Sequence, residues 1–162
     1  MWELTISRCA WKRLYRWLTE NDREQACLLG AAKSLDRIDS VIPVQGIEEA
    51  NRFLPDMDAL NLQIHRWAAE GICFRGLIHS HPGGPSEPSD QDIQTMEAWT
   101  RAAQMPDLIF GIADIRRERK TIHLWRSELL PDNAVYHERL VPIYLKWPWT
   151  ARKWRLSHEK TD

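Results

Sequence analysis

The sequence predicts a single α/β domain in which a central sheet is flanked by helices. Segments with alternating or continuous apolar residues, typical of strands, are interleaved with segments whose apolar residues recur every three or four positions, typical of helices. A length of 162 residues suits one domain with one buried core. No internal repeat or low-complexity tract divides the chain.

Five elements are expected before residue 70. Alternation of polar and apolar residues predicts two strands, and a short apolar run between them predicts a buried central strand. Apolar residues three and four positions apart predict two helices, the second beginning at Asp56 and ending before Gly71. The expected elements are a strand over 2–7, a helix over 10–18, a buried strand over 26–32, a strand over 37–44 and a helix over 56–69.

The second half of the chain continues the alternation of strands and helices. The β-branched and aromatic run 72–79 predicts a strand, and the prolines and glycines of 82–88 can only form a loop. Ser89 and Asp92 have the spacing of a capping box that begins a helix extending to residue 103. Two further strands are expected over 108–113 and 121–125.

A fourteen-residue window holds His79, His81 and Asp92, which are zinc-ligand types. Residues two apart in a strand point to the same face, so the two imidazoles can converge on one ion. A His-x-His pair alone is typical of surface residues, and Ser89 with Asp92 alone is typical of a helix cap. Combined across the proline-glycine loop, they predict one zinc ion per chain with an open fourth position.

The arrangement His79-Ser80-His81-Pro82, six residues, Ser89, two residues, Asp92 resembles the metal-binding signature of the JAMM/MPN+ (JAB domain) zinc metalloproteases, in their compact bacterial form. The resemblance implies that His79, His81 and Asp92 hold the metal and that Ser89 stabilises the reaction intermediate. It also implies a layered MPN/JAB fold of the cytidine-deaminase-like type, with a curved mixed β-sheet flanked by helices.

The family also carries a glutamate at the start of a Glu-x-x-Gly-Leu segment, and Glu24-Gln25-Ala26-Cys27-Leu28 matches it with Cys27 in the glycine position. The resemblance therefore implies Glu24 as the general base, which would take a proton from the attacking water and give it to the departing amine. Three other glutamates remain alternatives for this role, namely Glu20, Glu48 and Glu49.

The chemistry expected of this set is direct hydrolysis of an amide or isopeptide bond. Zinc lowers the pKa of a bound water to about 7, and a hydrogen bond from Ser89 to the developing oxyanion contributes on the order of 3 kcal/mol. The resemblance implies a substrate that is a ubiquitin-like protein, or its conjugate, with a glycine-containing C-terminal tail. Further expected partners are E1/E2-like enzymes of the same conjugation system, including systems linked to antiviral (anti-phage) defence.

Two alternative functions remain open. The same chemistry would serve a peptidase that processes the tails of sulfur-carrier proteins. A non-catalytic MPN-type scaffold would bind partners without cleaving them, although the intact ligand set is unlike such relatives.

The domain prediction divides the chain into a JAB/MPN+ catalytic domain over 1–130 and a C-terminal extension over 131–162. The extension is rich in tryptophan and basic residues, which are frequent anchors of protein interfaces. It is expected either to bind a partner or to pack on the domain as a helix that covers one edge. The tryptophans concerned are Trp147, Trp149 and Trp154.

Composition excludes several function classes. The 22 basic and 23 acidic residues leave no strong net field, which argues against a general nucleic-acid or membrane binder. Cys9, Cys27 and Cys73 are irregularly spaced in apolar surroundings, which predicts reduced core thiols in a cytoplasmic protein. No run of 18 apolar residues and no leader-like N-terminus is present, so neither membrane insertion nor secretion is expected.

The remaining conspicuous residues are expected to be structural. The histidines predicted to lie on the surface are His65, His123, His137 and His158. The tryptophans predicted to pack in the core are Trp2, Trp11, Trp17, Trp67, Trp99 and Trp125.

Overall fold

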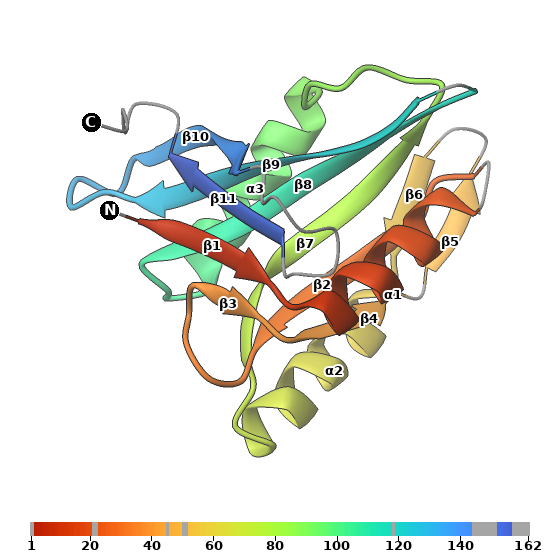
Figure 1. Ribbon diagram of the computed structural model, residues 1–162. Coiled ribbons are helices and arrows are strands. Elements are labelled where there is room, and N and C mark those ends of the chain that lie inside the picture. Colours follow the sequence, from red (N-terminus) through yellow and green to blue (C-terminus); the bar gives the residue numbers. More distant parts are fainter. Residues whose placement is uncertain are drawn as a thin grey trace.

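The computed structural model describes residues 2–20, 23–44, 46–49, 52–117, 119–143 and 152–156. In this part of the chain a nine-stranded sheet and three helices form the body of the molecule, beside a two-stranded hairpin (Figure 1). The large sheet has the strand order β3-β1-β11-β10-β9-β8-β7-β2-β4. The elements are β1 (Glu3–Ile6), α1 (Arg8–Thr19), β2 (Ala26–Ala31), β3 (Arg37–Ile38), β4 (Ser40–Pro43), β5 (Gly46–Glu49), β6 (Arg52–Pro55), α2 (Met57–Ala69), β7 (Cys73–Pro82), α3 (Asp90–Ala102), β8 (Asp107–Arg116), β9 (Arg119–Leu129), β10 (Val135–Ile143) and β11 (Arg152–Leu156).

Strands β7 and β8 form a parallel pair within the sheet and are joined by α3. Parallel neighbours need such a crossover, because a short hairpin can only reverse the chain. On either side the pairing is antiparallel, between β2 and β7 and between β8 and β9. The prediction of a mixed sheet flanked by helices is therefore confirmed.

The helices cover the two faces of the sheet unequally. On one face α1 packs Leu14 into a cluster that includes Ile78 of β7. On the opposite face α2 buries Trp67 and α3 packs Met96 beside Phe110 of β8. Burial of each large side chain contributes about 1.5–3 kcal/mol, so both faces stabilise the sheet. The end of β7 next to α3 is thus held between two packed layers.

Strand β7 ends at Pro82, three residues beyond the predicted end at residue 79, so His81 as well as His79 lies within it. The reason is the neighbouring strand β8, which continues to Arg116 and pairs with β7 as far as Pro82. The Gly83 N–H still donates to the Ile115 carbonyl oxygen, at 2.7 Å. The pairing fixes the backbone on which the histidines stand.

The predicted strand over 37–44 is two strands, because its pieces pair with different partners. Residues 37–38 form β3, which pairs in parallel with β1, and β4 pairs antiparallel to β2. The hairpin of β5 and β6 was not predicted.

The C-terminal segment adds to the same sheet. Strand β10, which was not predicted, pairs antiparallel with β9, and β11 lies between β10 and β1. Trp154 of β11 is 3% exposed, so the alternative of a covering helix is wrong for residues 152–156. Trp147 and Trp149 lie outside the described residues. The division of the chain at residue 130 stays a prediction.

Several expected core residues lie on the surface instead. Trp17 is 40% exposed, because the buried stripe of α1 consists of other positions along the helix. All three cysteines are free, but Cys27 alone is buried, and Cys9 and Cys73 are exposed. Burial raises the pKa of the Cys27 thiol to about 12, so it is protonated at neutral pH. None of the helices in the described ranges is long and apolar enough to cross a membrane.

Candidate metal centre

His79 and His81 stand two residues apart on one face of β7, and Asp92 of α3 closes the group. The two Nε2 atoms lie 2.8 Å apart, Asp92 Oδ1 lies 3.2 Å from His79 Nε2, and Asp92 Oδ2 lies 3.6 Å from His81 Nε2. Throughout the described ranges, this is the one group of three histidine, cysteine or acidic side chains whose ligand atoms lie within 4.8 Å of one another. The structure thus brings together the three side chains singled out as ligands.

The chemistry of this group fits a zinc ion. Ligand atoms about 2.0–2.1 Å from a tetrahedral zinc lie roughly 3.3 Å from each other, close to the separations of this group. His81 Nδ1 lies 2.9 Å from the Pro85 carbonyl oxygen, which can only accept a hydrogen bond. Nδ1 therefore donates to this carbonyl, which leaves Nε2, on the side of His79 and Asp92, as the nitrogen available to a metal. A carbonyl in this position commonly orients a metal-bound histidine.

Helix α3 holds Asp92 by reciprocal capping. Ser89 Oγ accepts a hydrogen bond from the Asp92 N–H at 3.2 Å, and Asp92 Oδ2 accepts from the Ser89 N–H at 2.8 Å and from its hydroxyl at 2.7 Å. Because Oδ2 takes part in the cap, Oδ1 is left to face His79. The cap explains why this carboxylate has one orientation.

Asp92 is ionised at neutral pH. Burial raises the pKa of this carboxyl, but the hydrogen bond and charge of His79 and the hydrogen bonds of Ser89 outweigh burial and hold the pKa well below its usual range. A metal ligand has to be deprotonated, so this shift favours ligation.

Glu24 lies on the approach to β2 and is half-buried. Ala26 pairs with His79, and the Ser80 N–H donates to the Gln25 carbonyl oxygen at 2.8 Å. Continued by one more residue, this antiparallel register sets Glu24 opposite His81, and residues directly opposite each other share a face of the sheet. The Gln25 N–H also donates to Ser80 Oγ at 2.8 Å, which holds the two segments together at this point.

The alternatives to Glu24 are less well placed or lie outside the description. Glu20 follows the end of α1, is exposed, and lies 3.9 Å from Arg16. Glu48 and Glu49 belong to β5, and their side chains are not among those described.

The loop between β7 and α3 is tied to β10 by a contact that sequence reasoning missed. Glu87 Oε1 lies 2.7 Å from Arg139 Nη1, and Arg139 Nη2 lies 2.7 Å from His123 Nδ1. His123 was predicted on the surface, but it is half-buried, and burial followed by the Arg139 charge lowers its pKa. Glu87 and Arg139 are 52 residues apart, and no local pattern in the sequence links them.

The other histidines do not join the group. His65 is exposed on α2, as predicted. His137 is half-buried and its Nδ1 lies 2.7 Å from Ser127 Oγ, so the surface prediction is wrong for it. His158 lies outside the described residues.

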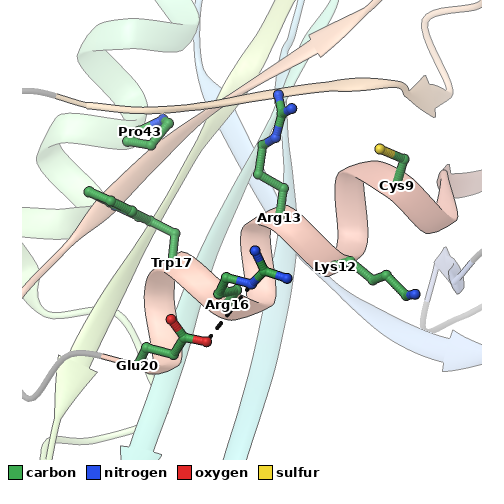
Figure 2. A pocket seen from close by; sticks show the side chains of 7 residues that line it. All are labelled: Cys9, Lys12, Arg13, Arg16, Trp17, Glu20 and Pro43. Carbon is green, nitrogen blue, oxygen red and sulfur yellow. Dashed lines mark ion pairs between the residues drawn. The ribbon is translucent and has the colours of Figure 1, made fainter.

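A separate hollow lies between the outer side of α1 and β4, lined by Trp17, Arg13, Arg16 and Pro43 among others (Figure 2). It belongs to the face of the sheet that α1 covers, whereas His79 and His81 belong to the face under α3. It therefore contributes nothing to the candidate metal centre.

Comparison with known proteins identifies the family. The model of the prokaryotic homologs of the JAB domain matches residues 10–128, which is most of the chain. The protein therefore belongs to this family, and the resemblance seen in its motif is confirmed.

Individual relatives agree with this assignment. The chain is 30% identical over 101 residues to the "Probable TtuB-protein conjugate cleaving protease" of Thermus thermophilus, over 61% of this chain and 63% of the relative. It thus spans less than two thirds of that relative. The solution structure of protein DSY2949 from Desulfitobacterium hafniense matches with a TM-score of 0.58 and 20% identity, over 82% of this chain and 88% of that chain, which shows a shared fold.

Proposed function

We propose that the protein is a zinc-dependent metallo-isopeptidase or peptidase that cleaves after the C-terminal tail of a ubiquitin-like protein. The observation that carries the proposal is the convergence of His79, His81 and Asp92, with His81 Nε2 directed into the group. Membership of the JAB family supports it, and so does the relative named for cleaving TtuB-protein conjugates.

His79, His81 and Asp92 would hold the zinc ion. When bound, zinc supplies Lewis acidity and lets water lose a proton near neutral pH. With exposed side-chain fractions of 20%, 11% and 20%, the three side chains leave the site open to substrate.

Glu24 is the proposed proton carrier. Opposite His81, it accepts the proton of the attacking water as the new C–O bond forms, and it returns a proton to the amine as the C–N bond breaks. Ser89 is the proposed donor to the oxyanion. Its hydroxyl hydrogen binds Asp92 Oδ2 in the structure, so this hydrogen has to turn from the carboxylate to the substrate during the reaction.

The substrate tail is proposed to bind as an added strand. In the described part of the chain β4 is the edge of the large sheet nearest to β7, separated from it only by β2. A glycine-containing tail pairs through its backbone, and the absence of side chains allows a close approach to the catalytic group. Three free cysteines suit a reducing compartment, and we place the enzyme in the cytoplasm.

The test is cleavage of a TtuB–protein conjugate, the substrate class named for the relative, by zinc-loaded full-length protein. Glu24→Gln should retain zinc and the fold while turnover falls about 100-fold. Glu20→Gln is the matched control and should retain full turnover, because Glu20 is exposed and faces Arg16. Equal turnover of Glu24→Gln and wild type would refute the assignment of the base. Full zinc occupancy without any cleavage would favour a non-catalytic scaffold.

A further inference from the structure

The turn between β8 and β9 is the most basic segment near the candidate metal centre. Residues 116–120 read Arg-Arg-Glu-Arg-Lys, whereas the whole chain has a net charge of −1. Arg116, Arg117, Arg119 and Lys120 are all exposed. Figure 1 shows this turn beside the C-terminal end of β7.

The register of the sheet relates this turn to the histidines. His81 is paired with Asp114, and Arg116 follows two residues later on β8. Two residues along a strand span about 6.6 Å and return to the same face. Arg119 is paired with Arg116 and therefore shares that face. Both arginines thus border the face that carries His81.

The local contacts leave these arginines available to a ligand. Arg116 Nε lies 3.0 Å from Asp114 Oδ1, and Arg119 Nε donates to Thr121 Oγ1 at 3.1 Å, which orient the two side chains without neutralising both. Arg117 makes no ion pair or hydrogen bond with the described part of the chain. Lys120 differs, because it donates to the Thr19 carbonyl oxygen at the end of α1, on the other face.

The strand order assigns the turn to one side of the scissile bond. The order β8-β7-β2-β4 puts the β8–β9 turn and the β4 edge on opposite sides of the histidines. Under the proposed function the tail binds along β4, so the segment that departs on cleavage extends toward β8. At about 3.3 Å per extended residue, the arginines lie within reach of the second to fourth residue after the bond.

We propose that Arg116, Arg117 and Arg119 form a subsite that selects carboxylate side chains about two to four residues beyond the scissile bond, on the departing side. This inference rests on the proposed function and adds to it a preference for substrates with acidic residues in the departing segment. The subsite acts by charge at an exposed surface, so its effect is modest, salt-dependent and expressed mainly in KM.

The experiment uses zinc-loaded full-length protein and quenched fluorescent peptides. Each peptide has a tail segment ending in Gly-Gly joined to a departing segment with Glu, Gln or Lys at its second and third positions. A parallel set carries the same substitutions on the tail side of the bond. Values of kcat and KM are measured at low salt and at about 0.5 M NaCl, where charges more than a few ångströms apart are screened.

The expected preference for Glu over Lys in the departing segment is about 5- to 10-fold in kcat/KM at low salt, and most of it disappears at the higher salt concentration. Arg117→Glu/Arg119→Glu should reverse the preference, with the change expressed mainly in KM. The matched control Lys33→Glu/Arg66→Glu makes the same charge change on exposed residues beyond the opposite end of β7, and should keep the wild-type preference.

The outcomes separate this inference from the proposed function. Cleavage of all peptides at equal kcat/KM, or a preference confined to the tail side, would overturn the subsite and leave the peptidase standing. No cleavage of any peptide or TtuB conjugate would overturn the peptidase itself. If the double variant fails to fold, the salt dependence of the wild-type preference and the single variant Arg117→Gln decide the question.

Discussion

Strand β7 carries a charged cluster at each end, and the two clusters differ in what they bring together. At the N-terminal end, Arg75 contacts Asp107 of β8 through a hydrogen bond to its backbone carbonyl and an ion pair to its carboxylate, and Arg126 of β9 binds the same carboxylate at 2.6 Å. At the C-terminal end, His79, His81 and Asp92 direct possible metal-ligand atoms at one another.

The first cluster pairs each guanidinium with a carboxylate, since Arg126 also lies 3.1 Å from Glu128 Oε2, whereas the second gathers potential metal ligands. The side chains of Arg75 and Asp107 are 2% and 7% exposed, so solvent and ligands are largely excluded. The His79, His81 and Asp92 side chains keep 20%, 11% and 20% of their surface exposed. A buried and internally neutralised network is structural, whereas an accessible group of lone pairs suits a cation that arrives from solution.

The largest expected effect comes from removing an acceptor at the C-terminal end. His81→Ala should abolish zinc retention and lower cleavage by about three orders of magnitude, because Lewis acidity contributes several kcal/mol to catalysis. Zinc content after desalting and turnover of the TtuB conjugate are the measurements. His65→Ala removes an exposed histidine of α2 and should retain both properties. Activity that survives without zinc would defeat the ligand assignment.

The next largest expected effect comes from removing the shared carboxylate of the cluster at the N-terminal end of β7. Asp107→Asn leaves two guanidinium groups without their common carboxylate and should lower the free energy of unfolding by about 3 kcal/mol. Urea unfolding measures this loss, while zinc content should stay unchanged. Asp132→Asn is the control, because Asp132 is exposed and its role as an acceptor for the Ala134 N–H can be kept by Asn. A stability equal to wild type would mean that this network contributes nothing.

The same cluster predicts a pH dependence. Burial raises the pKa of Asp107, but the charge of Arg75 and the hydrogen bonds of Arg126 and Arg75 outweigh burial and lower the pKa below its usual value. The stabilisation is therefore fully present above the unfolded pKa of about 3.9 and is lost as the pH falls through the lower folded value. In urea titrations from about pH 7 to about pH 3, the stability difference between wild type and Asp107→Asn should begin to narrow once the pH falls below about 3.9.

The smallest effect separates capping from catalysis. Ser89 and Ser7 are both helix N-caps, at α3 and α1. Replacing either by Ala should cost about 1 kcal/mol of stability. Only Ser89→Ala should also lower kcat, by up to about 100-fold, if its hydroxyl serves the oxyanion. Equal kcat for the two variants would reduce Ser89 to a structural cap.

Local patterns in the sequence predicted a large part of both fold and site. The spacing of His79 and His81 sets them on one face of any strand, and the capping spacing of Ser89 and Asp92 begins a helix wherever it stands. These are properties of backbone geometry within a few residues. These local spacings are sufficient to select the three side chains that converge in the structure.

Other features depend on pairing between distant segments. β11 forms because β1 and β10 both offer a free edge, and its Trp154 then packs in the core. Nothing local distinguishes that segment from a helix or a partner-binding tail. The ion pair between Glu87 and Arg139 likewise depends on segments that are distant in the sequence.

The sequence alone determined which residues share a face and where helices begin, because these follow from chain geometry with periods of about 2 and 3.6 residues. Tertiary structure alone decided that the segment before β2 runs beside the end of β7, with Ala26 paired to His79, and that the β8–β9 arginines border the same face. The physical reason is that strand register and order depend on burial summed over the whole sheet, which no local window of the chain contains.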